Sequence, residues 1–146
     1  MKDKLDGKDC FIDSNIWLYS FIISQDGNKS NISRSLIQSD DIIISTQVIN
    51  EVCINLIRKA HFSEKDIQHL IGNFYERYHV VEINKEIIHK ASVIREHHNF
   101  SFWDSHILAS ALYANAEILI SEDMQNNFTI QQLTIINPFN GSRDGK

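Results

Sequence analysis

The 146-residue chain is poor in the residues that define several classes of protein. It has one proline and five glycines, too few for a disordered or collagen-like chain or for a β-sandwich dense in turns. No apolar run approaches the roughly 20 residues that cross a bilayer, and the amino-terminal end lacks the apolar stretch of a signal peptide. We therefore expect a single domain over residues 1–146, in the cytoplasm, with a frayed tail at 140–146.

Cysteine and positive charge are also scarce. The two cysteines, Cys10 and Cys53, belong to no CxxC pair and no His/Cys pattern that would hold zinc, so we expect buried thiols in a reducing compartment. The formal net charge is -5, which argues against a broad basic surface for nucleic acid. That argument weakens if several acids hold a metal ion, because the bound cation would neutralise them.

Short apolar runs alternate with longer amphipathic segments along the chain. This alternation predicts an α/β fold with a central five-stranded parallel sheet flanked by helices. The predicted strands cover residues 10–12, 41–45, 79–83, 117–121 and 133–137. The predicted helices cover residues 16–23, 31–38, 46–57 with Thr46 as its cap, 63–78, 84–98 and 104–111, and residues 25–29 are predicted to form a loop.

Asp13 ends the first predicted strand, Cys10-Phe11-Ile12. In open α/β sheets, ligands bind outside the carboxyl ends of the strands, where the strand order reverses. We expect this strand to be central, so Asp13 would face a ligand. Asp13 could equally cap the helix that follows, because an aspartate side chain accepts hydrogen bonds from the free N–H groups of a helix start. The sequence leaves both interpretations open.

Three further acids occupy similar places, and each has a structural alternative. Glu51 lies near the start of the helix after the second strand, where the helix dipole also favours an acid. Asp104 falls on the apolar face of a later helix, but its spacing from Ser101 also fits a capping box. Asp123 follows the fourth strand, where a lone aspartate is commonly a turn residue.

The predicted fold would bring these four carboxylates to one edge of the sheet. Two carboxylates about 4 Å apart repel by roughly 4 kcal/mol at an effective dielectric near 20, so a cation must offset the cluster. Oxygen ligands without histidine or cysteine suit Mg²⁺ or Mn²⁺. The sequence has no GxSxG elbow, P-loop or Cys/His pair, and a metal-activated water would serve as the nucleophile.

Four short motifs carry these acids in a fixed order. They are Asp13-Ser14-Asn15, Ser45-Thr46-Gln47-Val48 followed by Asn50-Glu51, Phe102-Trp103-Asp104, and Leu119-Ile120-Ser121-Glu122-Asp123. The motifs resemble those of the PIN-domain ribonucleases. Their spacing and the ending at 133–139 are similar to the toxins of bacterial toxin–antitoxin operons, often called VapC-type, and the resemblance covers nearly the whole chain.

The resemblance implies a single PIN-like domain that acts as a divalent-metal-dependent endoribonuclease, with Mg²⁺ or Mn²⁺ as cofactor. It also implies RNA as the substrate, a small antitoxin protein as the partner, a homodimer formed through helices, and no membrane association. Four residues match the acidic quartet of the family, and two match its supporting polar positions. The acidic quartet is Asp13, Glu51, Asp104 and Asp123, and the supporting residues are Asn15 and Ser121.

Two features depart from the family pattern, and two other functions stay open. Glu122 offers a second carboxylate beside Asp123, and Asn126-Asn127 stands where near relatives often carry an Asp-Gly turn. One alternative is a catalytically silent PIN-like module that binds RNA or a protein. The other is a phospho-acceptor receiver domain, which needs a lysine near its last strands, whereas no lysine follows the fourth strand until Lys146.

Overall fold

The structure, a computed structural model, describes residues 5, 7–22, 27–39 and 41–140. Its centre is a six-stranded sheet in the order β3-β2-β1-β4-β6-β5, parallel except for the β5–β6 pair. The strands are β1 (Cys10–Ile12), β2 (Ile42–Ser45), β3 (His79–Val81), β4 (Ile118–Ile120), β5 (Thr129–Ile130) and β6 (Leu133–Ile136). The described helices are α2 (Ser14–Phe21), α3 (Gly27–Leu36), α4 (Thr46–Ala60), α5 (Glu64–Arg77), α6 (Lys85–His97) and α7 (Phe102–Tyr113).

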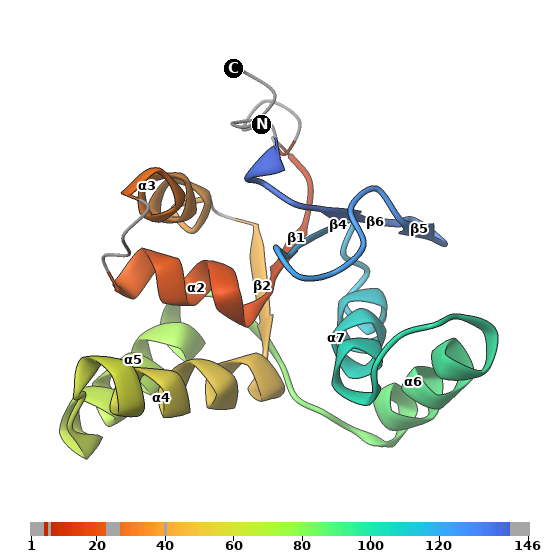
Figure 1. Ribbon diagram of the computed structural model, residues 1–146. Coiled ribbons are helices and arrows are strands. Elements are labelled where there is room, and N and C mark those ends of the chain that lie inside the picture. Colours follow the sequence, from red (N-terminus) through yellow and green to blue (C-terminus); the bar gives the residue numbers. More distant parts are fainter. Residues whose placement is uncertain (1–4, 6, 23–26, 40, 141–146) are drawn as a thin grey trace.

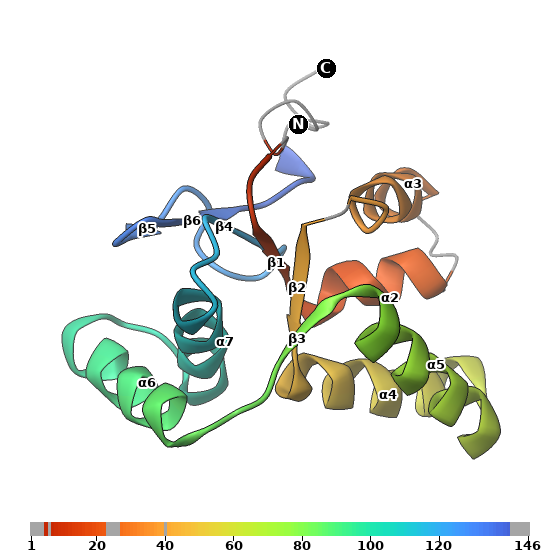
Figure 2. The same ribbon diagram turned by 180° about the vertical axis from the view of Figure 1, so that it is seen from behind.

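Helices cover both faces of the sheet. Figure 1 shows α2 to α5 on one side of β1 and β2, with α6 and α7 on the other, and the view from behind in Figure 2 agrees. Every residue of β1, β2 and β4 is buried, which explains why these strands read as continuous apolar runs rather than as an alternation. No described helix is long and apolar enough to span a membrane.

The strand order reverses beside β1. This strand pairs with β2 on one side and with β4 on the other, and the chain reaches β4 only after building β2 and β3. In the β1–β4 pair Ile12 lies opposite Ile120, so the next residues, Asp13 and Ser121, emerge together at the carboxyl ends. Such a reversal is where ligands bind in open parallel sheets. The predicted central place of the first strand is confirmed.

The predicted α/β fold with a parallel sheet is confirmed, but the sheet has six strands rather than the predicted five. The sixth, β5, has two residues and pairs antiparallel with β6 at the edge of the sheet. The turn between them contains Gln131 with a positive φ of 53° and no glycine, so the usual sequence signal of a hairpin is absent. A two-residue strand is also too short to show any periodicity.

Other local predictions need correction. Helix α3 begins at Gly27, inside the predicted loop 25–29, of which residues 25–26 lie outside the described residues. Ser45, not Thr46, caps α4, because its hydroxyl accepts from the N–H of Val48 at 3.3 Å. The Thr46 hydroxyl instead accepts from the N–H of Ile83 at 3.3 Å. In the predicted frayed tail, only residue 140 is described.

Candidate functional site

Asp13 both caps α2 and faces the point where the strand order reverses. Its Oδ1 accepts from the N–H of Ser14 at 2.7 Å, and its Oδ2 accepts from the hydroxyl of Ser121 at 2.8 Å. The side chain is buried, with 7% of the residue exposed. The two interpretations left open by the sequence are therefore compatible, since each carboxylate oxygen has its own partner.

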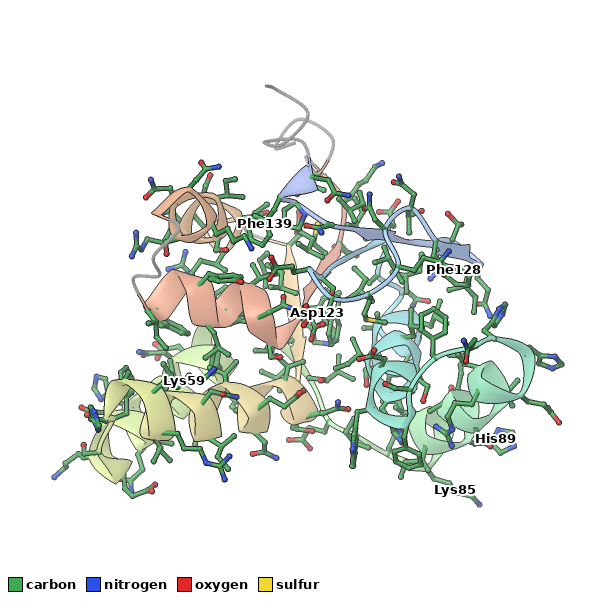
Figure 3. The ribbon with its side chains drawn as sticks, viewed as in Figure 1. Lys59, Lys85, His89, Asp123, Phe128 and Phe139 are labelled. Atoms are coloured by element: carbon green, nitrogen blue, oxygen red, sulfur yellow. The ribbon has the colours of Figure 1, made fainter. Side chains whose placement is uncertain are left out.

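Asn15 connects the start of α2 to the loop after β4. Its side-chain Nδ2 donates to Oδ2 of Asp123 at 3.1 Å, and its Oδ1 accepts from the N–H of Glu122 at 3.4 Å. Asp123 lies between α2 and α7 in the middle of the molecule (Figure 3). Asn15 and Ser121 thus contact the two aspartates that follow β1 and β4.

Glu122 points to other partners. Its Oε1 accepts from the hydroxyl of Tyr19 at 2.7 Å, and its Oε2 forms an ion pair with the ammonium group of Lys29. These contacts tie the loop after β4 to α2 and α3. Glu122 is therefore committed to a structural contact and does not compete with Asp123 as a free carboxylate.

Glu51 reaches the site from the second turn of α4. It is half-buried, and its Oε1 accepts from Nε2 of Gln47 at 3.4 Å. The same Gln47 nitrogen donates to the backbone carbonyl of Trp103 at 3.3 Å. Gln47 therefore links the start of α4 to the first turn of α7, which carries Asp104.

Asp104 is half-buried in the first turn of α7, and its predicted capping box is only half formed. The Ser101 hydroxyl accepts from the N–H of Asp104 at 3.1 Å. In the complete box at Ser63 the cap N–H also donates to the Asp66 carboxylate, at 2.9 Å. No such return bond from the Ser101 N–H to Asp104 occurs among the described residues, although a hydrogen bond with the Ser101 side chain lowers the pKa of the Asp104 carboxyl.

The four acids share one electrostatic field. Burial is the main cause that raises the pKa of Asp13, with Asp104 and Asp123 adding to it against hydrogen bonds from Ser121 and Ser14. Burial and then Asp13 raise the pKa of Glu51 to about 7. Burial raises the pKa of Asp104 against a hydrogen bond with the Ser101 side chain, and Asp123 adds to the rise. The groups that shift these three values include other members of the acidic quartet and no basic side chain.

The donor chemistry of the acidic quartet fits a hard divalent cation, although the side chains are not gathered around one point. Among the described residues, no three His, Cys, Asp or Glu side chains are grouped closely enough to hold a metal ion. Mg²⁺ in proteins usually has one or two carboxylate ligands and keeps several waters, so it needs no preformed cage of three. Burial is the largest cause of each raised pKa, so keeping these acids ionised together costs free energy that a bound cation would offset.

Comparison of the sequence with protein families identifies the family to which the chain belongs. The family model of the PIN domain matches residues 10–127. The chain belongs to the PIN domain family. The matched range contains the whole acidic quartet, and membership in this family rules out the alternative of a receiver domain. No curated protein matches the chain.

Three solved structures resemble this PIN domain in fold. A toxin–antitoxin complex from Klebsiella pneumoniae has a TM-score of 0.67 and 18% identity, over 88% of this chain and 97% of that one. VapC20 from Mycobacterium tuberculosis, described as a sarcin–ricin loop cleaving toxin, has a TM-score of 0.62 and 15% identity, over 75% and 86%. VapBC2 from Rickettsia felis, bound to promoter DNA, has a TM-score of 0.59 and 18% identity, over 86% and 96%.

The raised pKa of Glu51 predicts how the stability of this PIN domain depends on pH when no metal is bound. Its folded pKa of about 7 exceeds its ordinary value of 4.5, so the folded state binds more protons than the unfolded state between these values. The stabilisation is present below pH 4.5 and is lost as pH rises to about 7. We expect Glu51→Gln to flatten the fall in melting temperature between pH 5 and 8, measured in EDTA.

Glu96→Gln, at an exposed position of α6, is the matched control and should keep the wild-type slope. An identical slope in wild type and Glu51→Gln would show that Glu51 has an ordinary pKa.

Proposed function

We propose that this PIN domain is a divalent-metal-dependent endoribonuclease of the cytoplasm. The observation that carries the proposal is the position of two aspartates at the point where the strand order reverses, where Ser121 holds the buried Asp13 carboxylate and Asn15 holds Asp123. No basic side chain is among the groups that shift the pKa values of Asp13, Glu51 and Asp104. An uncompensated acidic site suits a cation that bridges carboxylates and a substrate phosphate. Family membership and the sarcin–ricin loop cleavage ascribed to VapC20 support the same reaction class.

In this proposal some residues of the chain bind the metal ion and others position the binding residues. The acidic quartet would hold Mg²⁺ or Mn²⁺. When bound, such an ion lowers the pKa of a water and neutralises charge on the leaving oxygen. Ser121 fixes Oδ2 of Asp13, and Asn15 fixes Oδ2 of Asp123. Glu51, whose pKa is about 7 without metal, would release its proton when a cation binds beside it.

A catalytically silent PIN-like module that binds RNA or a protein is the second candidate. The observation that favours it is that no three acids of the described residues are grouped as a metal site. The two candidates differ in whether RNA is hydrolysed when metal is supplied, so an activity measurement with matched variants separates them.

We expect the purified protein to cleave structured RNA with Mn²⁺ or Mg²⁺ and to stop when EDTA is added, with Zn²⁺ a poor substitute. Asp13→Asn and Asp104→Asn should each abolish cleavage. Asparagine caps a helix about as well as aspartate, whereas alanine costs roughly 0.5 to 2 kcal/mol. Because each Asn variant also removes a charge from a repelling cluster, its metal-free melting temperature should equal or exceed that of wild type.

Mn²⁺ gives a second readout that does not depend on turnover. A ligand that binds only the folded state adds about 2.7 kcal/mol at a hundredfold excess over Kd, so wild type should melt higher with Mn²⁺ and Asp104→Asn much less so. Undiminished cleavage in EDTA would refute the metal mechanism. Wild-type cleavage by both Asn variants would refute the assignment of the acidic quartet.

We further propose that the chain is the toxin of a toxin–antitoxin pair, acting on RNA as a homodimer and inhibited by a small antitoxin. The similar structures from Klebsiella pneumoniae and Rickettsia felis are toxin–antitoxin assemblies, which supports this role. An inhibitor that covers the acidic quartet would need an arginine or lysine there, because a buried carboxylate without a partner is costly.

Expression of this chain in bacteria should halt growth, whereas the Asp13→Asn variant at equal expression should not. Co-expression of the neighbouring small open reading frame should restore growth, and the two proteins should co-purify. Replacing the partner's basic residue at the acidic quartet by glutamine should weaken inhibition of RNA cleavage. A co-purified partner that leaves cleavage fully intact would contradict inhibition at this site.

A further inference from the structure

A groove opens beside the acidic quartet, between the first turns of α4 and α7 and the segment before α6. Its volume is about 740 Å³, within the range of small-molecule sites. Its walls include Asn50, Glu51, Ile88, Phe102, Trp103 and His106. We call this the aromatic groove.

The rings of the aromatic groove are exposed and yet closely packed with one another. Phe102 is 52% and Trp103 62% exposed, although large apolar side chains ordinarily avoid water. The ring centroids of Phe102 and Trp103 lie 5.0 Å apart, and His106 lies 4.8 Å from the first and 5.6 Å from the second. The three rings therefore form one aromatic surface that faces the solvent.

Contacts to the surrounding helices hold this surface in place. The guanidinium group of Arg95 lies 4.4 Å from the centroid of the Phe102 ring and donates to the Ser105 hydroxyl at 2.7 Å. Nδ1 of His106 is 2.8 Å from the carbonyl oxygen of Phe102. Gln47 donates to the carbonyl of Trp103. A platform fixed in this way loses little conformational entropy when a ligand stacks on it.

The aromatic groove borders the acidic quartet at Glu51. Glu51 belongs to both, and Asp104 directly follows Trp103 in the first turn of α7. A ligand in the groove would therefore lie beside the carboxylates to which we assign phosphodiester hydrolysis.

Charge argues for a base rather than a phosphate in this groove. Nucleic-acid affinity usually comes from Lys and Arg contacts to phosphates, but this chain has a formal net charge of -5 and its acids would repel phosphate near Glu51. Stacking of a base on an aromatic ring depends little on charge and raises affinity by roughly 5- to 150-fold per base. The amide of Asn50, exposed and without a hydrogen bond to any described residue, can in addition bond a base edge.

We propose that the aromatic groove binds an unpaired nucleobase of the RNA substrate, next to the phosphodiester that is cut. Trp103 and Phe102 supply the stacking surface, and Asn50 contacts the edge of the base. This inference rests on the endoribonuclease function proposed above and assigns to it the residues that bind the base beside the cut site. A second copy of the chain is the competing occupant, and the experiment below separates it.

Trp103 gives a direct readout, because the only other tryptophan, Trp17, is fully buried. A single-stranded oligouridylate, added in EDTA to prevent cleavage, should quench the fluorescence of wild type but not that of Trp103→Phe. An abasic ribose-phosphate oligomer of equal length should cause no quenching. Trp103→Ala should weaken oligouridylate binding by about 5- to 150-fold, whereas Trp103→Phe, which keeps an aromatic ring, should weaken it far less.

Tyr113→Ala is the matched control, since Tyr113 is an aromatic residue of the same helix with 44% exposure at the end away from the groove. It should bind oligouridylate like wild type. With Mn²⁺, Trp103→Ala should raise KM for a short single-stranded RNA more than it lowers kcat, because it removes binding and leaves the acidic quartet intact.

The outcomes distinguish this inference from the proposed function. Base-dependent quenching without any cleavage would support the aromatic groove as a base site and refute the nuclease. Cleavage with Mn²⁺, together with equal oligouridylate and abasic binding or an unchanged affinity of Trp103→Ala, would support the nuclease and overturn the base site. A Trp103→Ala protein that changes its self-association on gel filtration but not its affinity for RNA would assign the groove to a second copy and also overturn the inference.

Discussion

The hydrogen bond from the Ser121 hydroxyl to the buried Asp13 carboxylate is the contact on which the candidate site depends. It joins the residues that follow β1 and β4, the two neighbouring strands on either side of the reversal of strand order. A backbone hydrogen bond also joins the ends of these two strands, since the N–H of Asp13 donates to the carbonyl of Ile120 at 3.0 Å. A carboxylate so deeply buried retains its charge poorly, and the other acids lie within its field. A divalent cation bound here would compensate the negative charge of these acids.

Much of this arrangement could be predicted from the sequence, because it follows from alternation and strand ends. Buried parallel strands are uninterrupted apolar runs, and an acid directly after such a run emerges at the ligand edge of the sheet. Asp13 could be placed by this rule alone, whereas Ser121 and Glu122 stand between the fourth strand and Asp123. Glu51 and Asp104 lie on helices, where capping and the helix dipole give an acid equally good reasons to occur. Only the family resemblance separated these explanations.

The remaining features depend on tertiary contacts that leave no local pattern. Glu122 carries a carboxylate like its neighbour Asp123, and only its contacts with Tyr19 and Lys29 show that it is structural. Strand β5 forms because β6 offers an edge, not because two residues have a periodicity of their own. The aromatic groove joins α4, α7 and the segment before α6. In the sequence, Phe102 and Trp103 are merely two aromatics before an acid, and nothing indicates that both remain exposed.

Proton release on metal binding tests whether the acidic quartet forms one charge field that a divalent cation offsets. Mn²⁺ would be titrated into metal-free protein at pH 6 and pH 8 in two buffers of different ionisation enthalpy, so that the calorimeter counts protons. Glu51, with a pKa of about 7, is largely protonated at pH 6 and must lose that proton to accept a cation nearby. We expect Mn²⁺ to release more protons at pH 6 than at pH 8, and Glu51→Gln to reduce that difference. Mn²⁺ binding without proton release at pH 6, or no binding at all, would contradict this expectation.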